Sequence, residues 1–102
     1  MDNFSIRLAL RKIAEITCGI APTRIRVSAR FEDSRRIYRA AIPWDYRDEV
    51  CGLLRQKLDL DFHMEGSLLI LTESQARAVL DFAYSSDAVE VAASASDAQD
   101  RS

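Results

Sequence analysis

Six arginines lie between Arg24 and Arg39, and no lysine stands among them. A guanidinium group is planar, permanently charged and able to donate paired hydrogen bonds to phosphate or carboxylate oxygens. Five of these side chains are expected to share one face of a predicted β-hairpin: Arg24, Arg26, Arg30, Arg35 and Arg39. The sequence therefore predicts a cationic surface whose chemistry is the binding of anionic groups.

Three carboxylates, Asp59, Asp61 and Glu65, alternate along a second predicted hairpin and so share one strand face. Oxygen ligands of this kind can hold Mg²⁺ or Ca²⁺. Alternating acids are also the ordinary way to solvate an exposed strand, and a lone histidine, His63, excludes a histidine-based metal site. We therefore expect no metal site, and a His63 side chain that is solvated or ion-paired.

Motifs for nucleotide binding and catalysis are missing from the sequence. The three glycines, Gly19, Gly52 and Gly66, are isolated and form no phosphate-binding loop. There is no nucleophile elbow and no CxxC pair, and the two cysteines, Cys18 and Cys51, are expected to be free buried thiols. The sequence thus predicts a protein that is not an enzyme and takes no cofactor.

The charge of the chain is divided unevenly. Residues 1–47 carry 10 basic and 5 acidic side chains and residues 48–102 carry 4 and 11, which gives the net charge of −2. Opposite fields in the two halves suit surfaces that face each other or face a partner. Arginine outnumbers lysine 12 to 2, which favours a GC-rich bacterium or its phage as the source, because arginine codons are GC-rich.

A hairpin over residues 23–42 is expected to position the arginines. Apolar residues alternate with the basic ones, as in a strand with one buried face; they are Ile25, Val27, Ala29 and Phe31. A two-residue turn at Asp33-Ser34 makes the apolar faces of both strands coincide. The predicted pairs are Glu32 with Arg35, Ala29 with Tyr38, Val27 with Ala40 and Ile25 with Ile42.

A second hairpin is predicted over residues 58–71, where apolar and polar residues alternate. A turn at Glu65-Gly66 would pair Met64 with Ser67, Phe62 with Leu69 and Leu60 with Leu71. Leu68 and Ile70 then fall on the charged outer face of the sheet, where they could form the dry centre of an interface. Trp44, between the first hairpin and the next helix, is expected to fill the core rather than to meet a partner.

Three helices are predicted from apolar residues at helical spacing, over residues 4–18, 45–57 and 73–84. Asn3 is the expected N-cap of the first helix. A capping box is expected before the third helix, from Thr72 and Gln75.

The order helix, hairpin, helix, hairpin, helix predicts an α+β domain over residues 1–85. It would consist of one four-stranded antiparallel sheet with the helices packed on one face. Residues 86–102 are rich in Ala, Ser and Asp without periodicity, and are predicted to be a disordered tail. In outline, the arrangement is similar to that of the acidic secretion chaperones, a resemblance that implies a dimer.

Three interpretations of the arginine-rich hairpin stay open. It binds the acidic surface of a protein partner, it binds nucleic acid, or its arginines form ion pairs with Asp59, Asp61 and Glu65 within one sheet. Nucleic-acid modules are usually basic, whereas this chain is acidic overall. Tyr38 is expected on the buried face, which leaves no aromatic ring among the arginines.

The sequence favours a non-enzymatic protein-binding module: a small bacterial or phage adaptor, chaperone-like protein or inhibitor, for example of a host defence complex. The predicted contact residues are Arg24, Arg26, Arg30, Arg35, Arg39, Leu68 and Ile70. Nucleic-acid binding through residues 24–39 is the alternative. No apolar run reaches the length of a membrane span and the N-terminal residues are charged, so we expect a cytoplasmic protein. A homodimer stays open.

Overall fold

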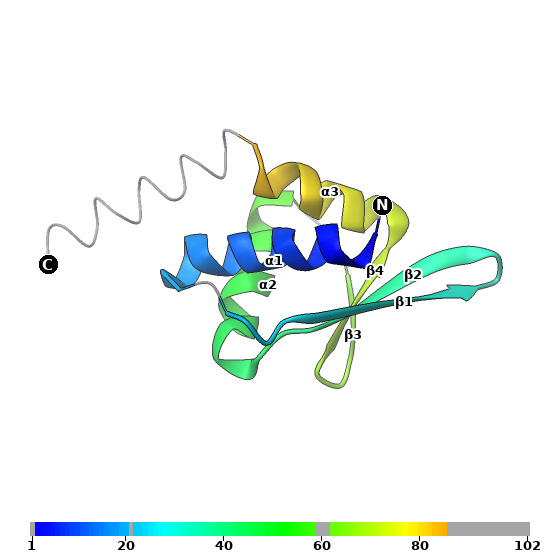
Figure 1. Ribbon diagram of the computed structural model, residues 1–102, viewed down its shortest axis with the longest axis horizontal. Helices are drawn as coiled ribbons and strands as arrows, with labels where there is room; N and C mark the ends of the chain where they lie inside the picture. Colours follow the sequence, from blue (N-terminus) through cyan, green and yellow to red (C-terminus); the bar gives the residue numbers. More distant parts are fainter. Residues whose placement is uncertain (1, 21, 59–61, 86–102) are drawn as a thin grey trace, which may run out of the picture.

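The computed structural model describes residues 2–20, 22–58 and 62–85, and the predicted disordered tail over residues 86–102 lies outside them. Along the chain the elements are α1 (Asn3–Cys18), β1 (Arg26–Glu32), β2 (Arg35–Ala41), α2 (Trp44–Leu58), β3 (His63–Glu65), β4 (Leu68–Thr72) and α3 (Glu73–Ala83) (Figure 1). The predicted class is confirmed, because three helices accompany one four-stranded antiparallel sheet among the described residues.

The strands lie in the order β1-β2-β4-β3, so β2 and β4 are central and β1 and β3 form the edges. Alternate residues of the central strands are buried: Tyr38 and Ala40 on β2, Leu69 and Leu71 on β4. α1 contacts β1, and α3 contacts β2 and β4, while α2 packs against the other two helices. Figure 1 shows the helices grouped together and the β1–β2 hairpin running out past them.

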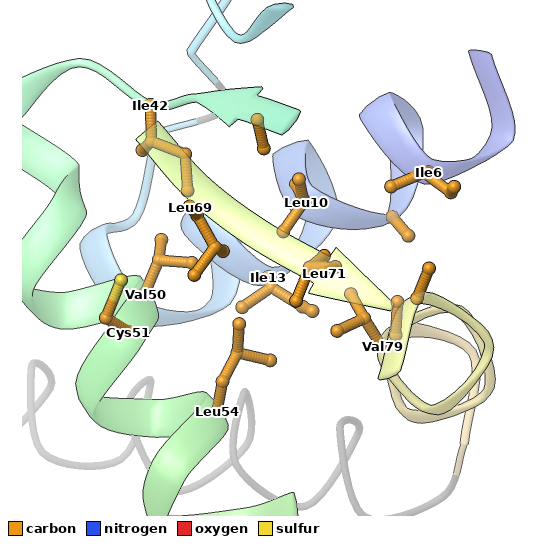
Figure 2. Packing of buried hydrophobic residues seen from close by; sticks show 14 of the residues in the cluster. Ile6, Leu10, Ile13, Ile42, Val50, Cys51, Leu54, Leu69, Leu71 and Val79 are labelled. Atoms are coloured by element: carbon orange, nitrogen blue, oxygen red, sulfur yellow. The ribbon is translucent and has the colours of Figure 1, made fainter. Parts of the chain in front are cut away.

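The helices and the sheet share one apolar core (Figure 2). The side chains that meet there come from every helix and from β4: Ile6, Leu10, Ile13, Val50, Leu54, Leu69, Leu71 and Val79. Tyr38 is the largest fully buried side chain, and no charged residue of the described part is buried. Apolar area removed from water, worth about 25 cal/mol per Å², is therefore the main source of stability.

The register predicted for the first hairpin is confirmed from the Arg26–Ala41 pair to the Glu32–Arg35 pair. Its turn residues, Asp33 and Ser34, both take positive φ, 52° and 65°. Two positive φ values are typical of a type I′ turn, whose twist matches the twist of antiparallel strands. The turn and the alternation of apolar residues thus specify the same register.

Phe31 corrects the predicted inner face of this hairpin. Its place in the register puts it on the same side as Val27 and Ala29, yet the residue is 74% exposed. The hairpin reaches beyond the helices (Figure 1), so the described helices do not cover its outer end. Alternation along a strand predicts the side on which a residue lies, but not whether another element covers it.

The register predicted for the second hairpin is wrong. Met64 pairs with Leu69 instead of Ser67, so the turn is Gly66-Ser67 rather than Glu65-Gly66. Gly66 has a φ of 60°, and glycine at the first position satisfies a type II′ turn. The predicted turn would have placed Glu65 there. Because Met64 moves by two residues along its partner strand, every side chain keeps its predicted face.

The helix ends follow local hydrogen bonds. Asp2, not Asn3, caps α1: its Oδ1 accepts from the backbone N–H three residues later at 2.8 Å. The predicted capping box of α3 is confirmed, since the backbone N–H of Gln75 donates to Thr72 Oγ1 and that of Thr72 donates to Gln75 Oε1. α2 continues through Leu58, which the sequence had assigned to the second hairpin.

Candidate functional site

The sheet face opposite the buried one carries most of the residues that the sequence singled out. We call it the outer face. Its residues follow two cross-strand rows, Arg26–Ala41–Leu68–Glu65 and Ser28–Arg39–Ile70–His63, with Arg30 and Ile37 beside them. Leu68 and Ile70 therefore lie on the predicted face, next to Arg39 and Glu65.

Four apolar side chains form the centre of the outer face. We call Ile37, Ala41, Leu68 and Ile70 the apolar centre, and all four are half-buried. Ala41 pairs with Leu68, so the set spans the two central strands. Ile37 and Ala41 were not singled out from the sequence, although the predicted register of the first hairpin already places them on this side.

The arginines of the predicted contact set fall into two groups. Arg39 Nη2 lies 3.0 Å from Glu65 Oε2, and Arg30 Nε lies 3.2 Å from Glu32 Oε1. The others make no ion pair within the described part of the chain: Arg24, Arg26 and Arg35. Carboxylates of the chain thus neutralise Arg30 and Arg39, whereas Arg24, Arg26 and Arg35 have no such partner among the described residues.

The strand order explains this division. Arg26 and Arg30 belong to β1, and two strands separate β1 from β3, which carries Glu65. With about 4.8 Å between neighbouring strands, the separation is roughly 14 Å. The interpretation that the arginines form ion pairs within the sheet therefore holds for Arg39 with Glu65, and Arg26 and Arg30 lie too far from Glu65 to share it. Asp59 and Asp61 lie outside the described residues.

A concavity of about 390 Å³ adjoins the outer face at its Arg26 end. Its lining comes from β1, β2, the start of α2 and the β3–β4 turn: Arg24, Arg26, Ala41, Ile42, Pro43, Trp44, Asp45 and Ser67. Trp44 is 78% exposed, so the prediction that it fills the core is wrong. Ile42, which is 3% exposed, occupies the core at this junction instead.

Trp44 therefore changes the chemistry available at this end of the sheet. Two guanidinium groups, those of Arg24 and Arg26, line the same concavity as its indole ring. Guanidinium groups bind carboxylates, and an exposed indole offers a large flat surface for apolar or planar groups. We call this concavity the Trp44 pocket.

The ionisable groups with shifted pKa values have structural explanations. Burial raises the pKa of the Cys51 thiol, which keeps it protonated and unreactive. Cys18 is also free but only half-buried, contrary to the prediction that both thiols are buried. Hydrogen bonding with Ser5 lowers the pKa of the Asp2 carboxyl, as its N-cap position requires.

The described ranges contain neither a cluster of metal ligands nor a membrane span. No three or more ligating His, Cys, Asp or Glu side chains gather there. No helix there is both long and apolar enough to cross a bilayer.

Comparison of the chain with protein-family models, with curated proteins and with solved structures finds no match. The outer face is therefore interpreted from its own chemistry. That chemistry consists of an apolar centre, a rim of guanidinium and carboxylate groups, and an exposed indole at one end.

Proposed function

We propose that the protein is a non-enzymatic protein-binding module that holds its partner on the outer face. The observation that carries the proposal is the apolar centre, which stays half-exposed on a sheet face lined with charges. A dry centre with a polar rim is the usual anatomy of a protein interface. The proposal takes the helices as packed on the other face, and the burial of Tyr38 and Leu71 there supports it.

The rim favours a partner whose contact segment is acidic. Arg24 and Arg26 border the Trp44 pocket and make no ion pair within the described residues. Tryptophan and arginine are the residue types most enriched where truncation weakens binding strongly. A segment with carboxylates on either side of an apolar or aromatic residue would fill the pocket and lie across Leu68.

The class of module follows from size and composition. A small bacterial or phage adaptor, chaperone-like protein or inhibitor, for example of a host defence complex in the cytoplasm, fits a chain of 102 residues with a net charge of −2. Arginine-rich, lysine-poor composition supports that source. The contact residues proposed for this role remain Arg24, Arg26, Arg30, Arg35, Arg39, Leu68 and Ile70.

The proposal is tested by capturing the partner from the source cells and titrating the purified pair by calorimetry. Leu68→Asp should weaken binding roughly tenfold or more, because it charges the apolar centre. Phe4→Ser is the matched control, since Phe4 is 62% exposed on α1 and is not part of the outer face. If Leu68→Asp binds the partner as tightly as the wild type does, the outer face is not the binding surface.

Nucleic-acid binding through residues 24–39 is the second candidate, and one observation favours it. Phe31 is exposed near the hairpin turn, where it pairs with Arg36 across the strands. An aromatic ring beside Arg36 can stack on an unpaired base while guanidinium groups of the hairpin contact phosphates. The sequence had predicted no exposed ring at this place.

Salt separates the two candidates. Phosphate contacts release counterions, so affinity for a single-stranded oligonucleotide should fall steeply with salt. A protein partner centred on Leu68 and Ile70 should lose much less affinity over the same salt range, because only its charged rim is screened. Phe31→Ala should reduce oligonucleotide binding, and Arg77→Ala on α3 should not. Absence of oligonucleotide binding at low salt would reject this candidate and leave the first intact.

A further inference from the structure

We propose that two copies of the chain pair through the free edge of β1, antiparallel and with a two-fold axis at Ala29. The outer face then continues from one copy into the next. This inference concerns the edge of the sheet and shares Arg26 with the proposed contact surface. Its test measures self-association in the absence of any partner, so its failure can be distinguished from a failure of the proposed function.

The free edge of β1 offers three residues for pairing. β1 is the last strand of the described sheet and is hydrogen-bonded only to β2. In a two-residue hairpin the residues that flank the turn exchange backbone hydrogen bonds, so Glu32 directs its backbone groups toward Arg35. Every second residue then directs its N–H and C=O groups away from β2: Val27, Ala29 and Phe31.

Arginines of helix α1 occupy the backbone carbonyl groups of the segment that precedes β1. Arg7 Nε donates to the carbonyl of Ile25 at 2.7 Å, and Arg7 Nη2 donates to that of Thr23 at 3.1 Å. Arg11 Nε donates to the carbonyl of Pro22 at 2.8 Å. These carbonyl groups already have donors, so a second strand can pair only from Val27 onward.

One register uses the whole open edge. With the axis at Ala29, Ala29 pairs with itself and Val27 pairs with Phe31 of the second copy, so each outward N–H and C=O has a partner. With the axis at Ser28, Phe31 would face Ile25, whose carbonyl Arg7 occupies. With the axis at Arg30, that residue would face its own copy, and like charges directly opposite destabilise a sheet.

The side chains of this register are complementary. Arg26 lies opposite Glu32 of the second copy on the outer side. Each Glu32 carboxylate, 3.2 Å from Arg30 Nε of its own copy, then accepts a second guanidinium group across the dimer. On the inner side, Phe31, which is 74% exposed in one copy, lies against the partly buried Val27 of the other. The exposed ring that the fold leaves uncovered thus gains a neighbour.

The association has a defined end point. A two-fold interface uses the same patch on both copies, so pairing consumes both β1 edges and does not propagate into a fibre. A single strand pair buries less than the roughly 1,600 Å² of a standard interface. We therefore expect a dimer that dissociates on dilution and is visible by sedimentation equilibrium.

A charge exchange tests the register. Arg26→Glu places Glu opposite Glu32, and Glu32→Arg places Arg opposite Arg26, so each variant alone should raise the dimer dissociation constant roughly tenfold. Mixed with each other, the two variants restore opposite charges at both ends and should form a heterodimer. Circular dichroism of each variant confirms that the monomers are folded.

Each outcome decides something. A heterodimer from two monomeric variants supports the Ala29 register, and a wild-type chain that stays monomeric at every concentration overturns the proposal. Wild-type dimers that both charge variants leave unchanged also overturn it, because they would use another surface. Ala29→Pro should abolish pairing as well, since proline removes the central N–H while its place on an edge strand is tolerated.

Discussion

The two faces of the sheet are built from the same strands and have opposite surroundings. On β4, Leu69 and Leu71 are buried among the helices, whereas Leu68 and Ile70, which alternate with them, are half-buried. All four residues are aliphatic, so their side-chain chemistry does not set the difference. It comes from what lies over each face, and it separates residues that hold the fold from residues that are available to a partner.

The largest expected effect is on stability at the buried face. Leu71→Ala should lower the free energy of unfolding by about 2–5 kcal/mol, because it removes packing from a fully enclosed position and leaves a cavity. Leu68→Ala, on the same strand, is the matched control and should cost about 1 kcal/mol or less. Chemical denaturation measures both, and equal losses would contradict the distinction between the faces.

At the outer face, the effect should appear in binding. Trp44→Ala should weaken the partner complex about tenfold or more, because an exposed aromatic residue has the features of an interface anchor when it lies beside two arginines that make no ion pair within the described residues. Its unfolding free energy should change by about 0.5 kcal/mol or less, as is usual for surface positions. A large loss of stability instead would place Trp44 with the core residues.

Thr72 sharpens the comparison, because a residue at the end of β4 can stabilise the fold without being buried. Thr72→Ala removes the side-chain half of the capping box of α3 and should cost about 1 kcal/mol. Thr72→Ser keeps the hydroxyl oxygen and should restore most of the loss. Thermal unfolding of both variants checks this; identical losses would show that the hydroxyl bond does not matter.

The Arg39–Glu65 ion pair should contribute little. Its two side chains are 27% and 50% exposed, and pairs in contact with solvent typically couple by less than about 1 kcal/mol. A double-mutant cycle with Arg39→Ala and Glu65→Ala measures the coupling in unfolding free energy. Coupling well above that value would mean that the outer face, like the inner one, holds the fold together.

The smallest effect concerns Asp2, which lies on neither face. Its folded pKa is lowered below the ordinary value of 3.8, so the charged cap stabilises α1 above that pH and the contribution is lost as pH falls through the folded pKa. The difference in melting temperature between wild type and Asp2→Ala should therefore shrink in acid. If the difference in melting temperature stays constant as the pH is lowered through the pKa of Asp2, the charge of the Asp2 carboxylate does not contribute to the stability of α1.

Sequence patterns predicted what depends on neighbours along the chain. The first hairpin was predicted correctly because Asp33-Ser34 and the alternation of apolar residues specify one register. The second was not, since Glu65-Gly66 and Gly66-Ser67 give every side chain the same face and differ only in which residue takes positive φ. The predicted face of each side chain in the second hairpin is therefore correct, although the predicted register is wrong.

The errors in burial and in ion pairing have another cause: they depend on which elements lie over or beside one another in the folded chain. Phe31 and Trp44 are both apolar, so sequence patterns predict that both are buried. The sequence does not show that the helices end before they reach Phe31, nor that Ile42 fills the core in place of Trp44. The strand order β1-β2-β4-β3 likewise decided which arginine meets Glu65. Predicting these features needs the relative positions of elements distant in sequence.

Trp44 also determines how this protein can be observed. It is the single tryptophan of the chain, it is largely in solvent, and it lines the pocket at the end of the outer face. Because its indole ring is exposed to solvent in the folded state, unfolding should shift its fluorescence emission maximum only slightly. A ligand that covers the ring should shift that maximum to the blue, so intrinsic fluorescence would report occupancy of the pocket while circular dichroism reports folding.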